Sequence, residues 1–153
     1  MPVLFVRHAV AVGRRRWDDD DLVRPLSKRG RRQAGAIADR LAAYPLSAVL
    51  SSPAVRCVET VSPLGEAMRL SVERRDELAE GAGREAVDFV RGLLGQTVAL
   101  CSHGDVIPRV LEHLVVHDGL DLGERPEWAK GSTWVLEDDG TRFVKAFYVE
   151  PPA

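Results

Sequence analysis

Two histidines in this sequence each follow closely on a short apolar run. His8 comes after Val3–Val6 and Arg7, and His103 comes after Thr97–Cys101 and one serine. Arginine forks and imidazolium rings can bind the non-bridging oxygens of a phosphoryl group and stabilise the charge spread over them during transfer. A neutral imidazole can also attack phosphorus and form a covalent intermediate, which divides one difficult step into two easier ones. The pattern therefore indicates a site that binds a phosphoryl group and attacks it.

Placing these side chains requires strands and helices in alternation. Ala48–Ser51 resembles the two runs already named, and all three are typical of strands buried on both faces. Leu70–Arg74 is a further predicted strand. Apolar residues spaced at i, i+3, i+4 and i+7 predict four helices. The first is capped by Ser27 and ends before Pro45, the second starts at Pro53, the third ends at Gly95 and the fourth carries Pro108 in its first turn.

This alternation predicts an α/β fold, a three-layer αβα sandwich around a mostly parallel sheet. Ser132–Leu136 and Arg142–Val149 flank an Asp-Gly turn and predict a C-terminal hairpin. Sheets of this kind bind ligands outside the carboxyl ends of their strands. We therefore expect His8, His103 and Arg56 to meet at one edge, although they are far apart in the sequence.

The composition sets limits on the class of protein. A chain of 153 residues with 45% hydrophobic and 29% charged residues is typical of one soluble domain, here residues 1–153. The net charge of −2 predicts no general attraction to nucleic acid or to membranes. Cys57 and Cys101 lack the spacing of a metal site and indicate free thiols in a reducing compartment. With no apolar run long enough to span a bilayer and no signal-peptide core, we expect a cytoplasmic location.

The residues around the two histidines resemble those of the histidine phosphatase superfamily, which includes phosphoglycerate mutases and phosphohistidine phosphatases. Four segments match its signatures in the family's order across residues 3–104: Arg7-His8-Ala9; Pro25-Leu26-Ser27 with Gly30, Gln33 and Ala34; Ser51-Ser52 with Arg56 and Thr60; and Ser102-His103-Gly104. The chain is most similar to short members, in particular to the phosphatase domain appended to some MutT-type Nudix hydrolases. The resemblance implies the phosphoglycerate mutase-like form of the predicted sandwich.

The resemblance also implies roles for individual residues. His8 is the expected nucleophile, and the phosphoryl oxygens are expected to be held by Arg7, Arg56, His103 and Gly104. Glu80 fits a family pattern in which a carboxylate protonates the leaving oxygen, and Glu77 is the near alternative. Phosphohistidine phosphatases often lack this acid, so Glu80 favours phosphate esters or anhydrides. No metal or other cofactor is expected, because the arginines and His103 supply the positive charge.

A polar loop over residues 10–26 separates the first predicted strand from the first helix. Its candidates for substrate binding are Arg14, Arg16, Trp17 and Arg24. The arginines either hold a polyphosphate tail or form a solvated face paired with the acidic run Asp18–Asp21. The tryptophan either stacks on a base or packs on its own domain. His113 and His117, spaced i, i+4, lack the further pattern of a metal site.

These observations predict a metal-independent phosphatase with a phosphohistidine intermediate on His8. Its expected partner is a small phosphorylated substrate or a phosphohistidine protein; the candidates are a phosphate ester, a nucleoside polyphosphate and a protein phosphohistidine. One alternative is a non-catalytic module that binds phosphate or a partner. A phosphomutase is a weaker alternative, because the chain is too short for the insertions that shield the intermediate in mutases.

Overall fold

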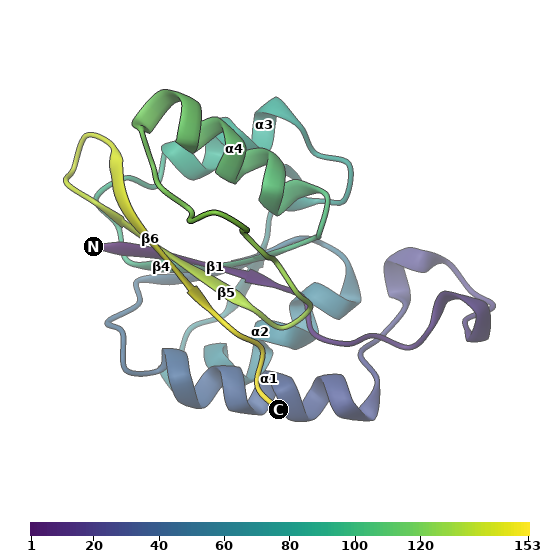
Figure 1. Ribbon diagram of the computed structural model, residues 1–153. Helices are drawn as coiled ribbons and strands as arrows, with labels where there is room; N and C mark the ends of the chain where they lie inside the picture. The colour runs from purple at the N-terminus through teal and green to yellow at the C-terminus, as the bar shows by residue number, and fades with distance from the viewer.

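Six strands form a single sheet between two layers of helices in the computed structural model, which describes residues 1–153 (Figure 1). The strands are β1 (Pro2–Arg7), β2 (Ala48–Ser51), β3 (Val72–Arg74), β4 (Val98–Ser102), β5 (Thr133–Asp138) and β6 (Phe143–Val149). The helices are α1 (Lys28–Leu41), α2 (Val55–Met68), α3 (Arg84–Arg91) and α4 (Val106–Asp118). The strand order is β3-β2-β4-β1-β5-β6. The predicted αβα sandwich is confirmed.

Four neighbouring strands run in parallel, and the predicted C-terminal hairpin adds two antiparallel strands beside β1. In the register of β1 with β4, Arg7 lies opposite Ser102. In the register of β2 with β4, Ser51 lies opposite Cys101. The residues that follow these strands, His8, His103 and Ser52, therefore leave the sheet at the same edge.

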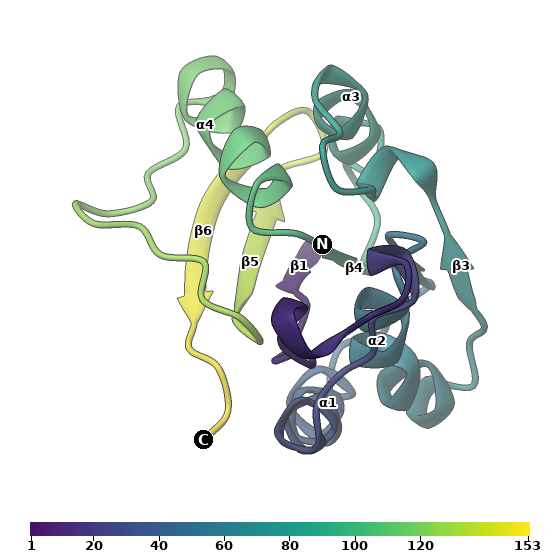
Figure 2. The ribbon, with the colours of Figure 1, turned by 90° about the vertical axis from the view of Figure 1, so that its right-hand side faces the viewer.

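The sheet separates two hydrophobic cores. Successive side chains of a strand point to opposite faces, so Val3 and Phe5 join a core of 20 buried residues, to which α3 and α4 contribute. Leu4 and Val6 join a core of 14 buried residues on the face of α1 and α2. Figures 1 and 2 show the same division, with α3 and α4 on one face and α1 and α2 on the other. No helix has both the length and the apolar character that crossing a bilayer requires.

Most predicted element boundaries agree with the structure to within one residue, and four were wrong by two or more. The first strand of the hairpin ends at Asp138 rather than Leu136, because its pairing with β6 continues to Asp138. The helix expected from Pro53 begins at Val55, since the first helical bonds run to the Ala54 carbonyl. The third helix ends at Arg91 rather than Gly95, because tight turns follow it. β3 begins at Val72 rather than Leu70, because the Leu70 N–H is used to close the end of α2.

The loop between β1 and α1 extends beyond the carboxyl-end edge of the sheet and lies nearest the viewer in Figure 2. It contains two short 3₁₀ turns, Arg14–Arg16 and Asp21–Val23. Its base is closed where the Ser27 N–H donates to the Val10 carbonyl at 3.0 Å. Gly30 packs so closely here that a Cβ atom would lie 1.9 Å from the Val10 oxygen. Only glycine therefore fits where the start of α1 packs against Val10.

Candidate active site

The expected convergence occurs at the carboxyl ends of β1, β2 and β4. A cavity of about 350 Å³ opens there between the two ends of the loop over residues 10–26 and the start of α4. Its charged and ring-bearing lining residues are Arg7, His8, Arg14, Arg24, Glu80, His103, Asp105 and Lys130. Four of these carry positive charge and two are carboxylates, so the cavity suits an anion.

His8 is held as a neutral ring with one free nitrogen. Its Nδ1 lies 2.8 Å from the Ala9 carbonyl, and because a carbonyl only accepts, Nδ1 carries the proton and donates it. Burial lowers the pKa of His8 to about 3, and the nearby charges of His103, Arg56 and Arg7 contribute to the decrease. Nε2 therefore keeps its lone pair at neutral pH, as a nucleophile requires.

His103 packs against the His8 ring and is fixed by a serine. The two ring centroids lie 5.5 Å apart at an interplanar angle of 64°. His103 Nε2 forms a hydrogen bond of 2.8 Å with the Ser52 hydroxyl, which also accepts from the Ala54 N–H at 3.3 Å. His103 is thus oriented by Ser52, the residue that follows β2.

Arg7 lies flat against the backbone of Gly104. A Cβ atom on Gly104 would lie 2.6 Å from the Arg7 Cζ, so no other residue leaves the guanidinium in place. Arg7 Nη1 donates to the Trp128 carbonyl at 2.9 Å. Gly104 therefore makes room for the Arg7 guanidinium, and its role in phosphate binding stays a prediction.

Arg56 is almost completely buried, with 2% of its side chain exposed. Its Nη1 donates to the Asp21 carbonyl at 2.9 Å, and its Nη2 lies 3.2 Å from the Asp21 carboxylate. Thr60, one turn further along α2, donates to the Arg56 carbonyl and accepts from the Ala9 N–H at 2.9 Å. The Arg-x-x-x-Thr segment therefore links α2 directly to the residue after His8.

Three buried nitrogen atoms at this site have no hydrogen-bond partner: Arg7 Nε, Arg56 Nε and His103 Nδ1. Buried donors in folded proteins are almost always paired, and leaving one unpaired costs about 1–3 kcal/mol. These three are the only such side-chain atoms in the protein, and all belong to residues around His8. Such a set of donors matches an anion with several oxygen atoms.

The structure brings Glu80, and not Glu77, to the cavity. Glu80 Oε2 lies 3.5 Å from Arg56 Nη2, 3.5 Å from Arg14 Nη2 and 3.9 Å from His103 Nδ1. Glu77 instead accepts from Arg75 at 2.9 Å, which lowers its pKa. Of the two candidate glutamates, Glu80 is therefore the one that lines the cavity together with His8.

The four loop candidates divide into two groups. Arg14 and Arg24 line the cavity, whereas Arg16 does not and is exposed. The Trp17 indole donates to the Asp20 carbonyl at 2.9 Å, so it is bonded within its own loop. The acidic run pairs with the arginines through Asp21, whose Oδ1 lies 2.8 Å from Arg24 Nε.

Two residues of the site were not found by sequence reasoning. Asp21 was treated only as one of four acidic residues, although its proximity to Arg24 in the loop was a usable signal. Lys130 lines the cavity from the loop after α4. It lies in a segment without periodicity or a family signature, so nothing in the sequence singled it out.

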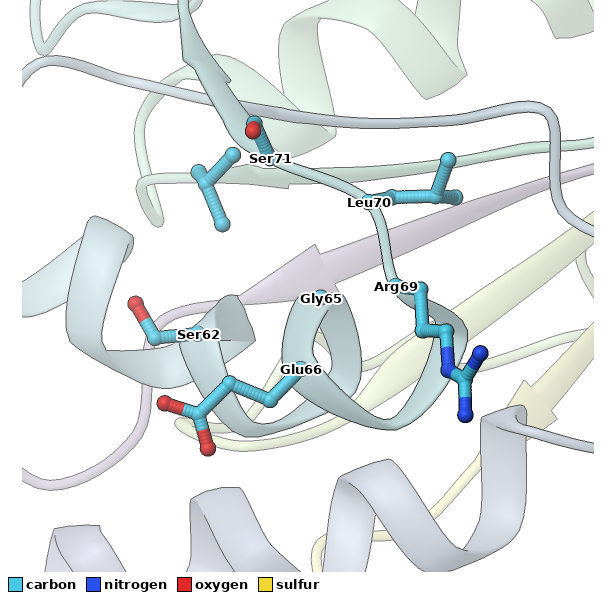
Figure 3. Close-up of a pocket in the computed structure, with 7 residues that line it drawn as sticks. Ser62, Gly65, Glu66, Arg69, Leu70 and Ser71 are labelled. Atoms are coloured by element: carbon cyan, nitrogen blue, oxygen red, sulfur yellow. The ribbon is translucent and has the colours of Figure 1, made fainter.

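A larger hollow of about 470 Å³ lies elsewhere, between the end of α2 and the start of β3 (Figure 3). The segment between a helix and the next parallel strand lies at the amino-end edge of a sheet, opposite the edge with the histidines. Ser62, Glu66 and Arg69 are among its lining residues, and it contains no histidine or cysteine. It has no nucleophile or group of unpartnered donors comparable to the site at His8.

Comparison with known proteins agrees with this geometry. The sequence profile of the histidine phosphatase superfamily (branch 1) matches residues 3–88, which include His8, Arg56 and Glu80. The chain belongs to the histidine phosphatase superfamily. The resemblance inferred from the four sequence segments is thereby confirmed.

Several known proteins are similar to this one over nearly the whole chain. The 8-oxo-(d)GTP phosphatase of Mycolicibacterium smegmatis is 35% identical over 98% of this chain. The chain spans 48% of that relative's length. The SixA structure from Agrobacterium tumefaciens has a TM-score of 0.77 and 25% identity, with 98% of each chain covered. The protein histidine phosphatase SixA in complex with tungstate has a TM-score of 0.78 and 20% identity, with 98% of this chain and 95% of that chain covered. This last likeness shows the fold.

The side chains of this family member do not form a metal site of the usual kind. No group of three or more histidine, cysteine, aspartate or glutamate residues is placed to hold a metal ion. His113 and His117 stack on each other on α4 with ring centroids 4.0 Å apart. The positive charge that the cavity does present belongs to arginine and lysine side chains.

Proposed function

We propose that this histidine phosphatase family member is a metal-independent phosphatase that forms a phosphohistidine intermediate on His8. The observation that carries the proposal is the state of His8: its Nδ1 proton is fixed by the Ala9 carbonyl, and its Nε2 lone pair is free. Next to this nucleophile lie three buried nitrogens without partners, which can take up the oxygens of a phosphoryl group.

The reaction proceeds in two displacements at phosphorus. His8 Nε2 attacks in line, so that the P–N bond forms while the bond from phosphorus to the leaving oxygen breaks. Arg7, Arg56 and His103 hold the non-bridging oxygens. Glu80, as the carboxylic acid, gives its proton to the leaving oxygen. A water molecule then attacks phosphorus, Glu80 takes a proton from it, and the P–N bond breaks to release phosphate and free His8.

Three classes of substrate fit this chemistry: a phosphate ester, a nucleoside polyphosphate and a protein phosphohistidine. The names of two relatives support the second and third classes, since one is an 8-oxo-(d)GTP phosphatase and another, at 25% identity, is named a phosphohistidine phosphatase. The presence of Glu80 in the cavity favours esters and anhydrides, because an oxygen leaving group benefits from a proton donor more than an imidazole does.

The direct test is release of phosphate in the presence of a metal chelator. The substrates are p-nitrophenyl phosphate, a phosphohistidine peptide and a set of nucleotides. We expect the wild-type protein to release phosphate and His8→Ala to be slower by a factor on the order of 10⁴ or more. His117→Ala, on the exposed outer side of α4, is the matched control and should retain activity. Turnover that survives in His8→Ala would disprove the mechanism. Binding of phosphate without turnover in the wild type would instead support the non-catalytic module.

A further inference from the structure

We propose that Lys130 and Arg14 form a second anion-binding site at the mouth of the cavity, next to the site of phosphoryl transfer. This second site receives the phosphate adjacent to the transferred one. The preferred substrates are therefore phosphate anhydrides with two or more linked phosphates. The inference rests on the proposed phosphatase function and selects one substrate class among those that His8 can serve.

Residues on either side of Lys130 are bonded to Arg7 at the end of β1 and to His8. The N–H of Gly131 donates to the carbonyls of both Arg7 and His8 at 3.1 Å. Two residues before Lys130, the Trp128 carbonyl accepts from Arg7 Nη1 at 2.9 Å. The loop after α4 is therefore bonded to Arg7 on both sides of Lys130, and it places the lysine in the cavity wall beside His8.

No protein group neutralises the charge of Lys130. Its side chain takes part in no ion pair and no hydrogen bond. Burial lowers its pKa, and the charges of Arg7, Arg24, Arg14 and Arg56 lower it further. Lys130 is exposed, so water solvates its ammonium group in the free protein. It nevertheless faces the same cavity as Arg7, Arg14 and Arg24, and a ligand with negative charge at the mouth of the cavity would reduce the repulsion among these cations.

Arg14 is available for the same ligand, whereas Arg24 is not. Arg24 Nε lies 2.8 Å from Asp21 and Arg24 Nη1 donates to the Val12 carbonyl at 2.7 Å. Arg14 has 69% of its side chain exposed, and its contacts with Glu80 and Asp21 are 3.5 Å and 4.0 Å. Contacts of this length are weak. Arg14 can therefore turn to a ligand at little cost.

The number of cations exceeds what a single phosphoryl group needs. Arg7, Arg56 and His103 already present unpartnered donors to the non-bridging oxygens of the reacting group. In a monoester or a phosphohistidine, the remainder of the molecule beside Lys130 and Arg14 has no phosphate for them to bind. In an anhydride, a second phosphate is joined through one bridging oxygen and brings anionic acceptors to both side chains. The cavity is therefore suited to an anhydride.

The test compares two substrates in Lys130→Gln, Arg14→Gln and the double variant. One substrate is ADP, which has two linked phosphates, and the other is p-nitrophenyl phosphate, which has one. We expect the ratio of kcat/KM for ADP to kcat/KM for p-nitrophenyl phosphate to fall about tenfold in each single variant, chiefly through KM. The matched controls are Lys145→Gln on β6 and Arg15→Gln, both exposed and outside the cavity, which should leave the ratio unchanged.

Equal losses on both substrates would overturn the second anion site. Wild-type turnover of p-nitrophenyl phosphate without any turnover of ADP would also overturn it, while leaving the proposed phosphatase intact. Binding of inorganic pyrophosphate to His8→Ala, measured by calorimetry, tests the site without turnover. Lys130→Gln in that background should weaken pyrophosphate binding about tenfold. Unchanged pyrophosphate affinity would contradict the proposal, even if every activity assay failed.

Discussion

Two regions of the site use the same kinds of side chain and hold them very differently: the floor, formed by Arg7, His8, Arg56 and His103, and the mouth, where Arg14 and Lys130 line the cavity. Arg56 lines an adjoining hollow that shares Glu80 and His103 with this cavity. It has 2% of its side chain exposed and is bonded to both the backbone carbonyl and the carboxylate of Asp21. At the mouth, Arg14 has 69% of its side chain exposed and no contact shorter than 3.5 Å. Both arginines contact the same Glu80 oxygen at 3.5 Å, so the two regions adjoin.

This difference suits the two regions to different tasks. Under the proposed function, fixed donors at the floor would stabilise developing charge without having to reorganise during the reaction. The fold bears the cost of keeping these nitrogens buried and unpaired. An exposed arginine at the mouth costs almost nothing in stability and can adapt to the remainder of a substrate. We infer that the floor determines the reaction and that the mouth determines which substrates are preferred.

A substitution that crowds the Arg7 guanidinium tests whether the floor determines the reaction. Gly104→Ala places a methyl group where it would lie 2.6 Å from the Arg7 Cζ, so the guanidinium must move. We expect kcat/KM for p-nitrophenyl phosphate to fall about 10²-fold, because misplacement of a catalytic group by about 1 Å has effects of that size.

The matched control for this variant is Gly35→Ala in α1. Nothing lies within 4 Å of the added methyl group there, and alanine favours a helix over glycine by up to about 1 kcal/mol. Activity should be unchanged and the melting temperature should rise. Full activity in Gly104→Ala would show that the floor is less rigid than its packing indicates.

Burial of His8 at the floor predicts a dependence of stability on pH. Its pKa in the folded protein is about 3, below its ordinary value of 6.5. Between these values the unfolded chain binds a proton that the folded protein does not, so stability falls as the pH is lowered through this interval, by up to about 1.4 kcal/mol per pH unit. Above pH 6.5 this contribution is constant.

The measurement is urea unfolding of the wild type and of His8→Gln at pH 7 and pH 5. The wild type should lose about 2 kcal/mol more on acidification than the variant, which lacks the titrating ring. Carboxylates titrate in both proteins, so their contributions to the loss of stability cancel when the wild type is compared with the variant. Identical losses would show that His8 is not held neutral by burial.

The smallest expected effects are those of substituting the two loop arginines, Arg24 and Arg14, on the free energy of unfolding. Arg24→Ala removes the bonds to Asp21 and to the Val12 carbonyl and should lower the free energy of unfolding by about 1–2 kcal/mol. Arg14→Ala should change the free energy of unfolding by no more than about 0.5 kcal/mol. Urea unfolding at pH 7 measures both. A loss in Arg14→Ala as large as in Arg24→Ala would mean that Arg14 is also part of the scaffold.

The residues at the floor of the site could be predicted from the sequence, because each follows closely on a strand or helix that its neighbouring residues identify. His8 and His103 follow directly on strands that apolar runs identify, and parallel strands end at the same edge of a sheet. The short spacing from Ser52 to Arg56 and Thr60 places all three at the start of one helix. Boundaries such as the start of β3 were missed, because the Leu70 N–H is used at the end of α2, which apolar periodicity does not reveal.

The sequence by itself determined the family, the αβα sandwich and the grouping of Arg7, His8, Arg56 and His103 at one edge of the sheet, because strand ends and helix starts are specified by neighbouring residues. Only the tertiary structure distinguished Glu80 from Glu77, made Asp21 the partner of Arg56 and brought Lys130 beside His8. These residues lie on loops, whose paths depend on contacts with distant segments. The Gly131 bond to the Arg7 and His8 carbonyls joins positions more than a hundred residues apart, and no periodicity in the chain predicts such a contact.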